Sequence, residues 1–166
     1  MNKFLITVLF SLIIFSSPVF CLEYDYSSTK NIPIKLSIME EISTKMPIVE
    51  GQTVKFKVLK DVEYGNLNLK KGDIVEGQIE CIVTSGMNGF PAEIILDNFK
   101  IPNVANTQLI STYTKSGQNR CIWVYPLKWA LTPFPPTGSI TNIIKGGHAR
   151  IKTTDIITLY YYPEWN

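Results

Sequence analysis

The sequence predicts an all-β protein, a small antiparallel β-barrel or sandwich that carries one irregular, aromatic and proline-rich segment. Apolar and polar residues alternate along much of residues 32–101, and a period of two is typical of strands with one buried face. Turns that contain glycine separate these runs, as tight connections between strands require. The alternation stops at residues 121–147, where prolines and large aromatic side chains gather.

The central stretch, residues 50–83, has the clearest strand pattern. Its first run alternates over residues 53–58, and turns at Gly65 and Gly72 separate it from a longer run over residues 74–83. Such a series of short strands and turns is a β-meander, which favours a closed or nearly closed antiparallel sheet of about six to eight strands. The residues that we expect in the core are Val54, Phe56, Val58, Val75, Ile79, Ile94, Leu96 and Ile157.

Other runs of the same kind flank this meander on both sides. Pro33 lies near the start of the first, and proline confines a strand start to an edge or an entry point. Residues 40–49 are expected to form a short helical turn or an irregular link, because Pro47 prevents a long helix. The remaining strands are expected at residues 32–38, 91–102, 109–114, 149–151 and 156–162.

The N-terminus has the pattern of a secretory signal peptide, residues 1–21. Lys3 precedes an apolar run that is too short to span a bilayer, which needs ~20 apolar residues, and small residues follow it. Cleavage is expected after Cys21, which leaves residues 22–31 as a flexible mature N-terminus and residues 32–166 as a single β-rich domain. An uncleaved anchor is one alternative. A lipoprotein acylated at Cys21 is another, although Phe20 is larger than the residue that usually precedes such a cysteine.

This N-terminus predicts an exported protein, periplasmic or envelope-associated, with the extracellular space as an alternative. We expect no transmembrane helix after the signal peptide, since no later segment is long and apolar enough. The whole chain has 16 Lys and Arg against 14 Asp and Glu, and the loss of Lys3 leaves a net charge near +1. Without a long basic run, nucleic-acid binding is not supported.

Two cysteines, Cys81 and Cys121, remain once Cys21 has left with the signal peptide. An even number of cysteines in an exported protein favours a disulfide, so we expect Cys81 and Cys121 to be bonded. The alternative is a pair of buried free thiols, because cysteine also packs as a small apolar residue.

The aromatic segment, residues 121–147, holds the candidate binding residues Trp123, Tyr125, Trp129 and Phe134. We expect these four side chains to form one cluster at the end of the barrel, tied to the meander through Cys121. Buried there, the cluster would plug or cap the barrel mouth. Exposed, it would stack on a glycan, bind a peptide or dock onto a partner protein.

No set of residues predicts catalysis, a metal or a cofactor. The one histidine, His148, follows two glycines, and nothing around either cysteine is typical of a nucleophile that a histidine activates. Two cysteines and one histidine without close spacing do not make a zinc site. The adjacent Glu40 and Glu41 do not form a glycosidase pair, and no phosphate-binding glycine loop is present.

A loose pattern of residues resembles bacterial envelope proteins. It runs through Ser43-Thr44-Lys45, Gly51 with Val54 and Phe56, and Lys71-Gly72-Asp73 with Val75 and Gly77. A late stretch, Gly147 to Ile151 followed by Ile157-Thr158-Leu159, completes it. This order is similar to the barrel domain of the channel-forming component of type IV secretion core complexes. The resemblance implies a small envelope β-barrel and no secretion function, since the aromatic segment has no counterpart in that pattern.

The sequence therefore predicts a non-enzymatic envelope protein that acts as a structural or interaction module. The main competing hypothesis is a module that binds a glycan or peptide through the aromatic segment. An enzyme with a cysteine–histidine pair and an eight-stranded outer-membrane barrel both have less support. The outer-membrane barrel needs strands of ~9–11 residues, and most runs in this chain are shorter.

Overall fold

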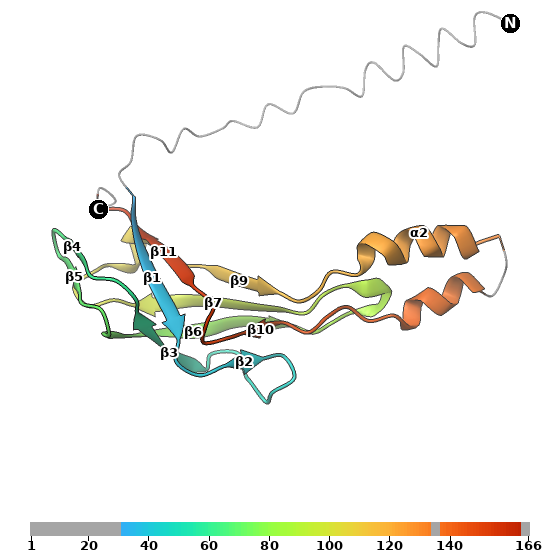
Figure 1. Cartoon of the computed structure of the whole chain (residues 1–166), viewed down its shortest axis with the longest axis horizontal. Helices are drawn as coiled ribbons and strands as arrows, with labels where there is room; N and C mark the ends of the chain where they lie inside the picture. Colours follow the sequence, from blue (N-terminus) through green and yellow to red (C-terminus); the bar gives the residue numbers. More distant parts are fainter. Residues whose placement is uncertain (1–30, 134–136, 164–166) are drawn as a thin grey trace, which may run out of the picture.

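The computed structural model describes residues 31–133 and 137–163. A curled antiparallel sheet forms one end of the molecule, and a narrow arm connects it to a group of short helices at the other end (Figure 1). The all-β class predicted from the alternation is confirmed. The predicted signal peptide, residues 1–21, and residues 22–30 of the predicted flexible N-terminus lie outside the described residues.

Most strands form where the sequence predicts them, β2 and β4 being additional, and every pairing is antiparallel. The main sheet has seven strands in the order β8-β11-β1-β3-β6-β7-β9, and β2–β10 and β4–β5 form two small sheets. The expected link at residues 40–49 contains the short strand β2. The strand bounds are β1 Ile32–Ile38, β2 Ile42–Ser43, β3 Thr53–Val58, β4 Val62–Tyr64, β5 Leu67–Leu69, β6 Ile74–Val83, β7 Glu93–Lys100, β8 Leu109–Ile110, β9 Tyr113–Ser116, β10 Arg150–Ile151 and β11 Ile157–Tyr161.

The two outermost strands of the main sheet, β8 and β9, are joined by only two residues, Ser111 and Thr112. A link this short holds the two edges of the sheet together, so the sheet must curl around its core. Asp97 on β7 fixes the link, because its carboxylate accepts hydrogen bonds from the hydroxyl groups of both linking residues. The expected strand at 109–114 is therefore two short strands with a bend between them.

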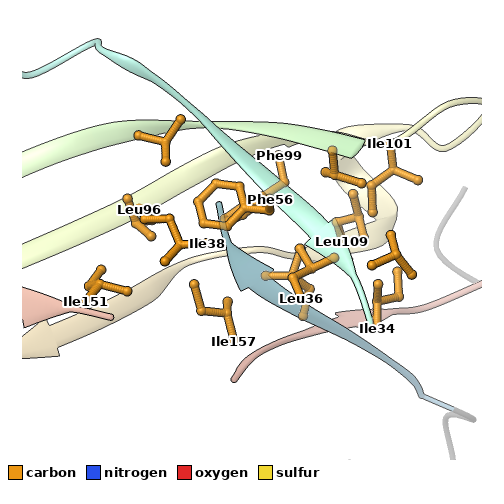
Figure 2. Close-up of a cluster of buried hydrophobic side chains, with 14 of the residues drawn as sticks. Ile34, Leu36, Ile38, Phe56, Leu96, Phe99, Ile101, Leu109, Ile151 and Ile157 are labelled. Atoms are coloured by element: carbon orange, nitrogen blue, oxygen red, sulfur yellow. The ribbon is translucent and has the colours of Figure 1, made fainter. Parts of the chain in front are cut away.

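Inside the curl lies one apolar core, shown in Figure 2. All eight core residues predicted from the sequence are buried. The rings of Phe56 on β3 and Phe99 on β7 pack with centroids 5.0 Å apart. Gly77 on β6 makes room for them, since a Cβ there would lie 2.9 Å from the Phe99 ring. A ring pair of this kind needs a position without a side chain beside it.

The arm, which we call the neck, consists of residues 84–92, 117–120 and 144–149 (Figure 1). Its first segment turns at residues 87–90, and this turn also belongs to the group of short helices. Backbone hydrogen bonds join its three segments, including Gly117 N to Ala92 O at 2.8 Å and Ala92 N to Gly147 O at 2.9 Å. Glycine permits this close approach: a Cβ on Gly146 would lie 1.9 Å from the Phe90 carbonyl oxygen. The neck is thus a narrow, hydrogen-bonded extension of the sheet.

Three helical elements cap the neck, and we call them together the helical tip. They are the 3-10 turn η2 Met87–Gly89, the helix α2 Cys121–Leu131 and the 3-10 helix η4 Thr137–Ile143. Residues 121–131 are thus regular helix, which corrects the expected irregular segment 121–147. Pro126 lies inside α2. A proline removes one backbone donor, and the leucines, alanine and lysine around it favour helix. Within residues 31–133 and 137–163, no helix is long and apolar enough to cross a membrane.

Candidate functional site

Helix α2 buries only one of its residues completely. Val124 is fully buried, and α2 contacts both η2 and η4. The start of the helix is fixed by the Asn119 side-chain oxygen, which accepts a hydrogen bond from Cys121 N at 2.9 Å. Its end is fixed by Thr132, whose N–H donates to Lys128 O at 3.0 Å. These contacts hold α2 at the end of the neck with most of its surface facing outward.

The outward surface of α2 is apolar, which is unusual for an exposed helix. Ile122 and Trp129 are 79% and 75% exposed, and Tyr125 lies between them at the i+3 position on the same side of the helix. Trp123 and Leu127 form a second exposed row at i, i+4 spacing. A helix that is apolar on nearly all sides is normally buried, so a surface of this kind marks a place where something else binds.

Residues from the other two elements of the tip extend this surface. Phe90, just after η2, meets Tyr125 edge to face, with ring centroids 6.4 Å apart. The single charged residue of α2, Lys128, donates from Nζ to the side-chain oxygen of Asn142 at 3.3 Å. The exposed apolar residues of the tip, which we call the apolar face, are Met87, Phe90, Ile122, Trp123, Tyr125, Leu127, Trp129, Ile140 and Ile143.

The structure corrects the expected position of the aromatic residues. Trp123, Tyr125 and Trp129 lie at the far end of the neck and do not plug the barrel (Figure 1). The reason is that residues 121–131 form a helix whose start is hydrogen-bonded to the neck, where Arg120 N donates to Gly89 O. Phe134 lies outside the described residues. Sequence reasoning missed Ile122, Leu127, Ile140 and Ile143, although helical spacing of apolar residues after Cys121 was the available signal.

The expected disulfide is wrong, because Cys81 and Cys121 are both free thiols in the structure. Cys81 on β6 pairs with Ile95, whereas Cys121 lies at the tip end of the neck and donates from Sγ to Asn88 O at 3.4 Å. Cys121 thus lies beside residues 88–89 and Cys81 beside Ile95. The extended chain from Gly89 to Ile95 is six residues long, at ~3.3 Å per residue, so the two cysteines lie far beyond the ~4.4–6.8 Å Cα spacing of a disulfide.

The remaining candidate chemical groups are occupied by structural contacts. His148 Nδ1 lies 3.5 Å from Thr44 Oγ1, whereas the Cys121 thiol contacts Asn88 O. The histidine and this cysteine therefore have different hydrogen-bond partners and do not form a pair. Burial raises the pKa of the Cys81 thiol, and the nearby Glu50 carboxylate raises it further. This thiol therefore stays protonated at neutral pH and is a poor nucleophile. Among the described residues, no three His, Cys, Asp or Glu side chains gather where they could hold a metal ion.

A second feature of the surface is an open groove of about 740 Å³ beside the neck. Its walls carry the basic side chains Lys45, Arg120, Lys145 and Arg150, together with His148 and a single acidic residue, Glu41. Sequence reasoning did not find this groove, because its basic residues come from three separate segments of the chain. We call it the basic groove.

The sequence matches no protein-family model and no curated protein. Functional inference therefore depends on the apolar face and the basic groove themselves. The resemblance to the barrel domain of the secretion channel component stays a prediction.

Proposed function

We propose that the protein is a non-enzymatic bacterial envelope protein that acts as an interaction module and docks onto a partner protein through the apolar face of its tip. The signal-like N-terminus supports export. The observation that carries the docking proposal is the outward side of α2, where Trp129 and Ile122 are mostly exposed while only Val124 is buried. Removing such side chains from water releases ~25 cal/mol for each Å² of apolar surface.

The composition of the apolar face favours a protein partner over a glycan. Large aromatic residues combined with aliphatic ones are typical of the centre of a protein interface. Sugar hydroxyl groups need hydrogen-bonding side chains around the stacking ring, but the exposed residues that accompany the tryptophans on the tip include the aliphatic Ile122, Leu127 and Ile143. The neck supports the same proposal, because it holds this face away from the barrel, where a partner can reach it (Figure 1).

Site-specific crosslinking tests the proposal directly. A photoreactive phenylalanine analogue replaces Trp129 in one variant and Ile74, an exposed residue at the start of β6, in a matched control. After irradiation in envelope extract, we expect one discrete protein adduct from position 129 and none from position 74. Equal adducts from both positions, or no adduct from position 129, would contradict the proposal.

A pair of double variants measures how much of the interaction depends on the apolar face. Ile122→Ser with Trp129→Ser removes two of its most exposed residues, and Ile74→Ser with Ile156→Ser replaces two exposed apolar residues of the barrel in the same way. We expect the first double variant to lose at least tenfold in affinity for the crosslinked partner and the second to keep it. A change in tryptophan fluorescence on adding an oligosaccharide that is lost in the first double variant, without any protein adduct, would favour glycan binding instead.

A further inference from the structure

The basic groove runs along the neck, from the β2 region beside the barrel to Arg120 and Lys145 near the tip, and three chain segments line it. Residues of the β2 region form one wall, Gln118 and Arg120 form another, and residues 145–150 form the third. Met46 is the single large apolar residue in its lining, so the groove suits a polar ligand. Its volume, about 740 Å³, lies within the ~300–1,000 Å³ that is typical of small-ligand sites.

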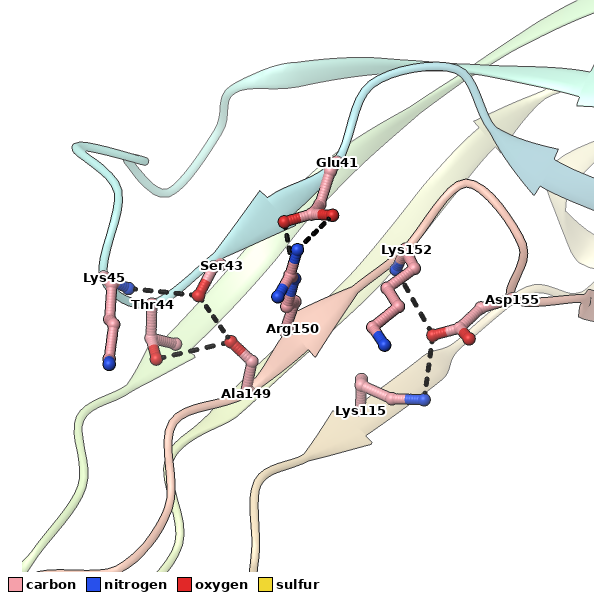
Figure 3. Close-up of polar contacts among 9 residues, drawn as sticks. All are labelled: Glu41, Ser43, Thr44, Lys45, Lys115, Ala149, Arg150, Lys152 and Asp155. Atoms are coloured by element: carbon pink, nitrogen blue, oxygen red, sulfur yellow. Dashed lines mark hydrogen bonds and ion pairs between the residues drawn. The ribbon is translucent and has the colours of Figure 1, made fainter.

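Positive charge is concentrated in this groove far beyond the average of the chain. Four Lys and Arg side chains face one carboxylate, an excess of three charges that exceeds the +2 of the whole sequence. Glu41 is held by Arg150 in a two-pronged ion pair, with Nη2 to Oε2 at 2.7 Å (Figure 3). Within the described residues, no carboxylate lies within salt-bridge distance of Lys45, Arg120 or Lys145.

The backbone around these basic residues is fixed in place. Ser43 Oγ donates to Ala149 O at 3.1 Å (Figure 3), and Thr44 N donates to the same oxygen at 3.0 Å, which joins the first wall to the third. Gly147 N donates to Gln118 O at 2.9 Å and joins the third wall to the second. A groove whose walls are already joined loses little conformational entropy when a ligand binds.

The available donors fit phosphate better than carboxylate. Arg150 has the planar fork that matches a carboxylate best, and Glu41 already occupies it. Lys45 and Lys145 are compact point charges, which bind phosphate oxygens from many directions. Arg120 donates from Nη1 to Lys145 O at 3.3 Å, and no other contact of its guanidinium occurs among the described residues.

We propose that the basic groove binds a ligand with two or more phosphate groups, through Lys45, Arg120 and Lys145. These three positive charges come from separate walls of the groove. A ligand with more than one phosphate therefore engages more of them than a single phosphate does. The site is distinct from the apolar face, and binding there does not depend on a protein partner. Because the groove is open to solvent, binding weakens as salt increases.

Isothermal titration calorimetry with inorganic pyrophosphate at low and moderate salt is the first test. We expect binding to the wild-type protein and at least a tenfold weaker affinity in the variant that carries Arg120→Gln and Lys145→Gln. The matched control carries Lys55→Gln and Lys100→Gln, the same number of neutralised charges at exposed positions on the barrel strands β3 and β7. We expect its affinity to change less than twofold.

Further arms identify the source of the phosphate and guard against a folding artefact. Lys45→Gln should weaken pyrophosphate binding several-fold. It should leave the melting temperature unchanged, because the Lys45 ammonium group makes no contact in Figure 3. Sedimentation with vesicles of cardiolipin, whose headgroup carries two phosphates, in phosphatidylcholine distinguishes a lipid headgroup from a soluble ligand, and binding in either arm that requires Arg120 and Lys145 supports the proposal. Failure of both pyrophosphate and vesicles to bind would overturn it. Equal weakening in the barrel control, or tighter binding of polyglutamate than of pyrophosphate, would also overturn it.

Discussion

The barrel and the helical tip use apolar residues in opposite ways. In the barrel, Phe56 and its neighbours alternate with lysines along β3, so every apolar side chain of this strand faces inward and every lysine faces solvent. In the tip, α2 buries Val124 and leaves Ile122 and Trp129 exposed. Large apolar side chains therefore stabilise the barrel from its interior, whereas at the tip they are exposed to solvent.

This difference shows which part of the chain stabilises the fold and which part is available for binding. A side chain that is already buried contributes to folding, whereas one that is exposed contributes only when a partner covers it. Substitutions at the two ends should therefore separate stability from binding.

The largest effect is expected from Phe56→Ala in the core. Phe56 is fully buried against Phe99, so its truncation leaves a cavity and should lower the free energy of unfolding by ~3–5 kcal/mol. Urea unfolding followed by circular dichroism measures the change. A loss below ~1 kcal/mol would mean that the core relaxes around the cavity and that the contrast with the tip is smaller than we infer.

Gly146→Ala should separate the tip from the barrel. The added Cβ would meet the Phe90 carbonyl oxygen, so the neck must shift and its hydrogen bonds weaken, at a local cost of ~1–3 kcal/mol. Hydrogen exchange should become at least tenfold faster in α2 and stay unchanged in β3 and β6. Gly65→Ala is the control: Gly65 lies in the turn between β4 and β5 with φ +55°, so alanine strains the backbone outside the neck with no atom near the new Cβ, and α2 should keep its protection there. Equal loss of protection in β3 would show that neck and barrel unfold as one unit.

A pH-dependent contribution is expected on the barrel side, from Lys115 on β9 and Asp155 just before β11. The Lys115 ammonium, 2.9 Å away, holds the pKa of the Asp155 carboxyl below its ordinary value of 3.8. The stabilisation is therefore fully present above pH 3.8 and is lost as the pH falls through the lower folded-state pKa. Both groups are partly exposed, so the pair should contribute only ~0.2–1 kcal/mol.

A double-mutant cycle of Lys115→Gln and Asp155→Asn measures this coupling by urea unfolding. We expect a coupling energy in that small range at about pH 7 and none once the pH has fallen below the lowered folded-state pKa, where the carboxyl is protonated. A coupling that persists in acid would show that packing of the two side chains, and not their charge, accounts for it.

The smallest effect on stability is expected from Trp129→Ala in the tip. This side chain is 75% exposed, so its removal should change the free energy of unfolding by less than ~0.5 kcal/mol. The same urea titration used for Phe56→Ala gives the comparison. A loss of several kcal/mol would place the indole inside the fold and remove it from the apolar face.

The barrel could be predicted from the sequence because its pattern is local. A period of two assigns Val54, Phe56 and Val58 to one face of a strand without any knowledge of the partner strand. The bend at Ser111 and Thr112 could not be predicted in this way. It depends on the curl of the whole sheet and on hydrogen bonds to Asp97, which lies on another strand.

The functional features depend on contacts between distant segments, and here sequence reasoning was less successful. An even number of cysteines suggested a bond, but it contains no information on the register that places Cys81 and Cys121 far apart. Pro126 suggested an irregular chain, although one missing donor does not end α2. The basic groove was missed because Lys45, Arg120 and Lys145 are brought together only by the neck.

The two-residue link between β8 and β9 has a consequence for how molecules of this protein aggregate. A long free strand at the edge of a sheet offers unpaired N–H and C=O groups to other chains and so promotes growth into extended sheets. Here the two edge strands have two and four residues, and their link holds both edges to the same curl. Strand addition at these two edges is thereby suppressed, so the exposed surface most prone to aggregation is the apolar face at the opposite end of the molecule.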